Sequence, residues 1–277
     1  RDGAGVGPRI ATLTPVASWL PQTGVALSGT TVTISGSSKT VTGIDFSGYR
    51  LINTGNNNII EDCLGDANTT GTTGNDRQWD IQGSNPTVRY CKIANPTPIG
   101  GTIMLSFNDA TGACLVDHCD LRDLAASDGI AGPDVGGGAN TLTIIDTLHK
   151  GIHLSVGSHI DAVDLRGAAP GSKISRLLSI GDKTTTSAAA GGGTGYTNVF
   201  HDLPTDPHGS ACNGLIFEEC IAVGHDDVGA QSIFIQVGNA ASTGIRMYDI
   251  LYDLREHNSL LHSSVRVDDW YARPFDY

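Results

Sequence analysis

Short segments of apolar or alternating apolar and polar residues recur along the whole chain. Examples are Leu215–Phe217 and Ile233–Ile235, which lie between positions rich in Gly, Asn, Asp and Ser. Such segments are typical of β-strands, and no stretch keeps apolar residues at helical spacing long enough to cover a sheet. The 36 glycines among 277 residues agree with frequent turns. The pattern therefore predicts many short strands without helical crossovers.

Three cysteines mark an internal repeat. Cys63, Cys91 and Cys119 follow one another at intervals of 28 residues, with an apolar residue three positions before each. The same frame continues one step earlier and four steps later, at Ser35, Thr147, Leu177, Cys220 and Tyr248, preceded by Val32, Ile144, Ile174, Phe217 and Ile245. The step before Cys220 is longer and contains the low-complexity run 184–193, which we expect to be an inserted loop.

A repeat of strands without helices can bury its apolar positions if the chain coils and successive turns stack in parallel. We therefore predict an all-β fold, a single-stranded right-handed parallel β-helix with turns of about 28 residues. Residues 1–30 would form an N-terminal cap or lead-in. Residues 31–255 would form the β-helix, with the inserted loop at about 183–213, and residues 256–277 a C-terminal cap or subunit contact.

The repeated cysteines are expected to fill the core. Their regular separation stacks the side chains roughly 4.8 Å apart along the coil. We call this stack, with the equivalent positions of the other turns, the column; it is not the convergent arrangement of a metal site. Neighbouring thiols such as Cys91 and Cys119 could reach bonding distance, but Thr147 and Leu177 occupy the same column. Cys114 and Cys212 lie outside this column.

Composition and charge exclude some partners. The formal net charge of −12 disfavours nucleic acid, and no run of about 18 apolar residues indicates a membrane span. The chain also shows no apolar signal-peptide core near residue 1.

The segment 113–121, Ala-Cys-Leu-Val-Asp-His-Cys-Asp-Leu, resembles the strand–bend–strand phrase of right-handed β-helix proteins of the pectate-lyase-like kind. That group includes polysaccharide lyases, uronan epimerases, some glycoside hydrolases and phage tailspikes. The resemblance covers roughly residues 30–255 and implies a polysaccharide as ligand.

A polar residue lies immediately before each column position, and stacking would place these residues about one strand spacing apart. This polar stripe consists of Asp62, Tyr90, His118, Asp146, Arg176 and Glu219. Tyr90 and His118 could transfer protons, Asp146 could orient His118, and Arg176 could bind a carboxylate. The alternative is that the stripe is a bend between two strands, stabilised by cross-turn pairs such as Asp146–Arg176.

A second candidate site follows the inserted loop. Asp206-Pro207-His208 is similar to a phrase of mannuronan epimerases, and the resemblance implies an acid or base role for His208 beside Asp206 at the sugar. His225 follows as a candidate for substrate binding. Leu203 and Gln236 stand where that family has Tyr and Asp, which favours lyase over epimerase action. The phrase could equally be a turn in which Pro207 presets the backbone.

Carboxylates offer two further kinds of chemistry. Hydrolysis of a glycosidic bond needs a facing pair, for which stacked turns offer Asp117, Asp120, Asp146 and Glu219. Asp226 and Asp227 are candidate ligands for Ca²⁺, which would help an acidic protein to bind an anionic glycan. No other cofactor is indicated.

The sequence thus predicts a carbohydrate-active protein that binds an extended polysaccharide, with a uronan lyase as the first expectation. His208, Asp206, His118 and Tyr90 are the catalytic candidates, and Asp146, Arg176, Glu219 and His225 the substrate-binding ones. The alternative is a phage tailspike or virion appendage, which could be a homotrimer, that binds a surface glycan. Either protein would act outside the cell or on a virion.

Overall fold

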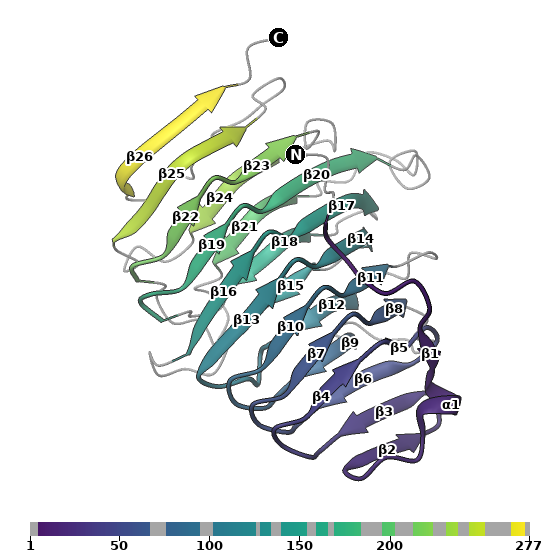
Figure 1. Cartoon of the computed structure of the whole chain (residues 1–277). Helices are drawn as coiled ribbons and strands as arrows, with labels where there is room; N and C mark the ends of the chain where they lie inside the picture. Colours follow the sequence, from purple (N-terminus) through teal and green to yellow (C-terminus); the bar gives the residue numbers. More distant parts are fainter. Residues whose placement is uncertain are drawn as a thin grey trace.

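The computed structural model describes residues 5–66, 76–94, 102–125, 128–133, 140–153, 159–165, 169–183, 196–202, 213–223, 231–237, 244–252 and 267–274. These residues form a parallel β-solenoid, in which the chain passes through three rows of strands in each turn (Figure 1). Glu61 and Arg89 are register partners in successive turns and lie 28 residues apart. The predicted all-β fold and the predicted turn length are therefore confirmed.

The first two rows belong to one 17-stranded sheet and meet at a bend. The first row contains β4 (Thr40–Thr42), β7 (Ile59–Glu61), β10 (Thr87–Arg89), β13 (Ala113–Asp117), β16 (Thr141–Ile145), β19 (Lys173–Ser175), β22 (Ile216–Glu218) and the start of β25 (Ile245–Tyr252). The second row contains β5 (Ile44–Asp45), β8 (Leu64–Asp66), β11 (Lys92–Ala94), β14 (Asp120–Ala125), β17 (Leu148–His153), β20 (Leu178–Lys183) and β23 (Ile221–Val223).

The third row is a nine-stranded sheet. It contains β2 (Val25–Ser28), β3 (Thr31–Ile34), β6 (Arg50–Asn53), β9 (Asp76–Ile81), β12 (Thr102–Ser106), β15 (Ile130–Ala131), β18 (His159–Leu165), β21 (Tyr196–Asp202) and β24 (Gln231–Val237). Among the described strands, only β2 and β3 pair antiparallel. At the two ends of the stack, β1 (Thr14–Pro15) pairs with β5 and β26 (Val267–Pro274) pairs with β25.

Strand register lines up the buried side chains in columns. In the first row Ile60, Val88 and Val116 are successive partners, and each is fully or almost fully buried. The column after the bend contains Ile44, Cys63, Cys91, Cys119, Thr147, Leu177, Cys220 and Ile250, all buried. In the third row Trp79, Leu105 and Ile130 stack in the same way. The core is therefore one continuous set of ladders along the solenoid axis.

The predicted frame is wrong at its two ends. After Cys220 the next turn is longer than the frame assumes, because Phe217 pairs with Met247, so Ile250 and not Tyr248 lies in the column. Before Cys63 the turn is much shorter, because Val41 pairs with Ile60. Val32 lies instead in the third row, where it pairs with Leu51.

The cysteines of the column are core residues, as predicted, and Cys114 outside the column is buried as well. Cys63, Cys91, Cys114, Cys119 and Cys220 are buried free thiols. Burial raises the pKa of Cys91 well above its usual value and raises the pKa of Cys220 to about 12. The Cys91 Sγ donates a hydrogen bond to the Arg89 carbonyl (3.2 Å), as the Thr147 hydroxyl does to Ile145 (3.0 Å). Thiol and hydroxyl therefore make equivalent hydrogen bonds at this position of the column.

Each bend between the first two rows is made by a single residue in the left-handed backbone region. Its φ lies between 47° and 56° at Asp62, Tyr90, His118, Asp146, Arg176, Glu219 and Asp249. The bend amide donates to the carbonyl just before the bend of the next turn, as from Tyr90 to Asp117 (2.9 Å) and from His118 to Ile145 (3.0 Å). The ladder continues through the bend, and this offsets the cost of about 1 kcal/mol or more that a non-glycine residue incurs there.

Replacing Cys91 tests the column. Cys91→Thr should lower the free energy of unfolding by less than about 1.5 kcal/mol, because Thr147 already fits the same position. Cys91→Asp should cost more than about 3 kcal/mol, because it buries an unpaired carboxylate. Urea unfolding of the two variants checks this, and equal losses would contradict the stacked column.

Replacing Glu219 tests the bend. Glu219 is exposed with a φ of 52°, so Glu219→Asn should leave the stability unchanged or raise it by up to about 1 kcal/mol. Glu219→Val should lower it by about 1–3 kcal/mol, because a β-branched side chain fits this region poorly. Thermal melts of both variants give the comparison, and a Val variant as stable as the Asn variant would count against the left-handed bend.

Candidate functional site

The bend residues form the polar stripe expected from the sequence, since all six predicted positions are bends of successive turns. Their side chains contact one another from turn to turn. Asp146 accepts two hydrogen bonds from Arg176 (both 2.7 Å), which confirms the predicted cross-turn pair. The rings of Tyr90 and His118 are stacked with centroids 4.9 Å apart. Five members of the stripe are half-buried or buried, whereas Glu219 is exposed.

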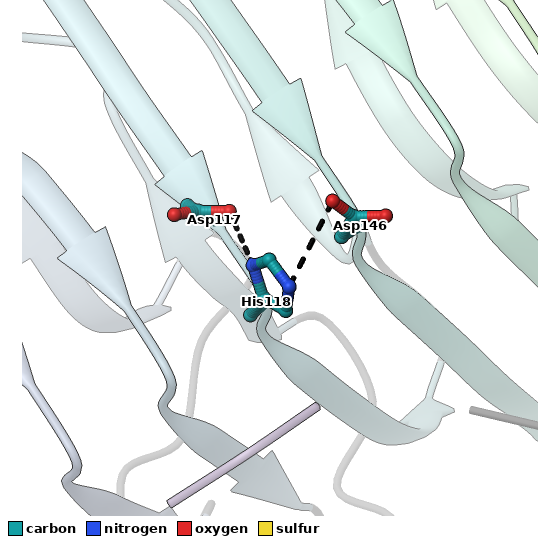
Figure 2. Close-up of side chains that lie close together, drawn as sticks. All are labelled: Asp117, His118 and Asp146. Atoms are coloured by element: carbon teal, nitrogen blue, oxygen red, sulfur yellow. Dashed lines mark hydrogen bonds and ion pairs between the residues drawn. The ribbon is translucent and has the colours of Figure 1, made fainter. Parts of the chain in front are cut away.

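His118 lies between two carboxylates (Figure 2). Its Nδ1 is 2.5 Å from an oxygen of Asp117, the last residue of β13, and its Nε2 is 3.7 Å from an oxygen of Asp146 in the next turn. The carboxylate that accepts the hydrogen bond of the ring, and so orients it, is therefore Asp117 and not Asp146 as predicted. With Nδ1–H donating to Asp117, the Nε2 atom is the one that can accept or release a proton.

An N-terminal segment lies over the first turns of the stripe. The Gly7 amide donates to the His118 carbonyl (2.9 Å), and the Arg9 guanidinium binds both oxygens of Asp62 (Nε–O distances of 2.9 and 3.2 Å). The same guanidinium lies 3.8 Å from the centre of the Tyr90 ring. We call residues 5–10 the strap; Figure 1 shows it crossing β14 and β11.

A pocket of about 340 Å³ opens at later turns of the same bend. One wall consists of the bend residues Arg176, Glu219 and Asp249, and the other of Leu178, Ile221 and Leu251, two positions further along the chain. Earlier in the stack the equivalent positions are His118 and Asp120, where Gly7 of the strap binds the His118 carbonyl and lies against the Asp120 side chain. The pocket and the strap thus occupy one bend groove, which we define as the space between these two rows of side chains.

Within the described part of the chain, two groups of side chains could hold a cation. Asp117, His118 and Asp146 have ligand atoms within 4.8 Å of one another, but both oxygens of Asp146 accept hydrogen bonds from Arg176. The charge of Asp146 is therefore already compensated. This favours a hydrogen-bonded cluster over a metal centre.

The second group consists of three buried carboxylates, Asp128, Asp161 and Asp164, next to β15 and on β18. Their oxygens also lie within 4.8 Å of one another, and carboxylate oxygens are what Ca²⁺ binds. Two further buried side chains belong to this row, Gln78 on β9 and Asn108 just after β12. Each has amide atoms without a hydrogen-bond partner in the described part of the chain.

These carboxylates and the strap were not predicted from the sequence. In this sheet Ile130 pairs with Val163, a longer step than the cysteine interval, so the frame of the cysteines cannot align Asp128 with Asp161. The contact between Arg9 and Asp62 joins residues 53 apart, outside any repeat. Asp249 was missed because the frame placed the last bend too early in the chain.

Several predicted site residues lie outside the described residues. These are Asp206, His208, His225, Asp226 and Asp227, together with Leu203 and Cys212. Gln236 belongs to β24, where only the backbone is described.

No protein family, curated protein or solved structure was found to match the chain. Among the described residues, no helix has the length and apolar character that a membrane crossing requires.

The contact between Arg9 and Asp62 should make stability depend on pH. Hydrogen bonds from Arg9 hold the pKa of Asp62 below its usual value. The stabilisation is therefore fully present above about pH 4, the unfolded value, and is lost as the pH falls through the lowered pKa of the folded state. Arg9→Ala should lower the melting temperature at neutral pH, and the difference from the wild type should shrink as the pH falls below about 4. A difference between the two proteins that is as large in acid as at neutral pH would contradict this origin.

Proposed function

We propose that the protein binds an extended polysaccharide along the bend groove and cleaves it as a uronan lyase. The observation that carries the proposal is the pair of Asp117 and His118 on the same stripe as the pocket of Arg176, Glu219 and Asp249. Stacked turns repeat about every 4.8 Å, a spacing suited to the successive units of an extended glycan. In this proposal the solenoid is related to the pectate-lyase-like kind.

The pocket has the composition of a sugar site. Leu178, Ile221 and Leu251 offer an apolar wall for the C–H face of a sugar ring, and the polar bend residues face them. Arg176 uses Nε and Nη2 for Asp146 and donates from Nη1 to Ser175 (3.1 Å). A guanidinium has five N–H groups, so Arg176 retains donors for the carboxylate of a uronic acid.

His118 supplies the chemistry. Its Nε2 takes the proton at C5 of a uronate, the C4–O4 bond breaks, and the electron pair of the broken C–H bond forms the C4–C5 double bond. The leaving O4 takes a proton, for which the Tyr90 hydroxyl is the nearby candidate donor. Asp117 keeps the imidazole in the orientation and tautomer that the step needs.

An ultraviolet assay on alginate, pectate and glycosaminoglycans tests this function, because the unsaturated product absorbs and the substrate does not. His118→Asn keeps a residue that tolerates the bend and should lower kcat by about 10²-fold or more. Asp117→Asn should lower kcat less. Lys39→Ala should leave kcat unchanged, because the Lys39 side chain lies against Gly36 before β4. Absence of the chromophore with every polymer would rule out the lyase.

The second candidate is a glycan-binding protein without turnover, such as a tailspike or virion appendage. It is favoured by the internal pairing of the stripe, in which Arg176 and Asp146 neutralise each other. A trimer in light scattering, with glycan binding that Arg176→Ala weakens and no released sugar, would support this candidate over the enzyme. An extracellular or virion-associated location suits both.

A further inference from the structure

We infer that the strap closes one end of the bend groove, so that the protein acts on the ends of glycan chains and not within them. This inference rests on the proposed function and names the part of the substrate that the site accepts. Its basis is that the protein's own residues 5–10 occupy the groove beside the bend residues of the early turns.

The strap lies inside the groove and not merely near it. A Cβ added to Gly7 would lie 3.6 Å from the Cβ of Asp120 and 3.8 Å from that of Lys92. Lys92 and Asp120 form the same wall that Leu178, Ile221 and Leu251 form at the pocket. On the opposite wall Gly7 binds the backbone of His118, the equivalent of Arg176 and Glu219. Strap and glycan would therefore use the same two walls at different turns.

Arg9 locks the strap in place. Its guanidinium pairs with Asp62 and lies 3.5 Å from a carboxylate oxygen of Glu61, while it covers the face of Tyr90. The Arg9 amide also donates to Asp62 (2.8 Å). The bend residues Asp62 and Tyr90 are thereby covered, and a sugar cannot stack on the covered Tyr90 face.

The pocket lies to one side of His118, over the turns of Arg176, Glu219 and Asp249, and the turn of Asp146, whose Leu148 is buried, separates the pocket from His118. From the turn of His118 to the turn of Asp249 there are four strand spacings, about 19 Å. A glycan that fills the pocket and reaches His118 meets Gly7 there, because Gly7 binds the His118 carbonyl. Only a chain that terminates near His118 fits, so cleavage would release products of a short and fixed size.

Variants of Arg9 test this in the whole 277-residue chain. Arg9→Glu places a carboxylate against Asp62 and Glu61 and should release the strap. Arg9→Ala should loosen it, and Arg9→Lys, which keeps the charge but loses the bidentate guanidinium, should loosen it less. Arg246→Ala, at an exposed arginine of β25, serves as the matched control. The readouts are the size distribution of the products and the loss of polymer viscosity per bond cleaved.

The wild type and Arg246→Ala should release short products with slow loss of viscosity, and among the Arg9 variants Arg9→Lys should depart from them least. Arg9→Glu should shift to internal cleavage, with viscosity falling several-fold faster per bond and with Arg9→Ala between the two extremes. Equal product distributions in all of these proteins would overturn the role of the strap and leave the lyase in place. A complete absence of turnover would instead overturn the proposed function, and this inference with it.

Discussion

The whole molecule depends on one backbone constraint, the unbroken parallel hydrogen bonding of residues at and around each bend. A left-handed residue turns the chain between the first two rows, and its amide still pairs with the next turn. Because the ladder does not break there, equivalent side chains stay in register on both sides of the bend. The buried column, the polar stripe and the walls of the bend groove are three results of this single register.

Acidic residues of the stripe are paired with arginines, one supplied by the register and one by the strap. Like charges one spacing apart would repel, whereas the structure pairs Asp62 with Arg9 and Asp146 with Arg176. His118 and Tyr90 lie between these two pairs. The proposed chemistry is therefore located where the stripe is held by neighbours on both sides, which limits the freedom of the imidazole.

Prediction from the sequence succeeded where turn length is constant. The cysteine interval identified the column from Cys63 to Cys119, and Asp146 with Arg176 followed as a pair because both precede column positions. Prediction failed at Tyr248 and Val32, because a longer turn at one end and a shorter turn at the other change the register. A frame carried forward at a fixed interval cannot detect such changes.

Contacts made by residues outside the repeat could not be predicted from the cysteine interval. The strap joins Arg9 to Asp62 through a contact that depends on where a non-repeating segment folds back, and the carboxylates of the third row are aligned by turns of another length. Hydrophobic periodicity specifies which residues face the core. It does not specify which outward-facing residues the loops and ends of a chain bring together.

Because an aromatic cluster lies at the first turns, tryptophan fluorescence is not equally sensitive to all turns of this solenoid. Trp19 of α1 (Val16–Trp19) contacts Phe46 edge to face at 6.0 Å, and Phe46 contacts Trp79 at 5.8 Å. Two of the three tryptophans thus report on the same end of the stack. In a quasi-one-dimensional protein each turn contacts only its neighbours, so fraying can begin at either end. Indole fluorescence would therefore report the melting of the early turns through two tryptophans and that of the opposite end through Trp270 of β26 alone, while the turns between them carry no tryptophan.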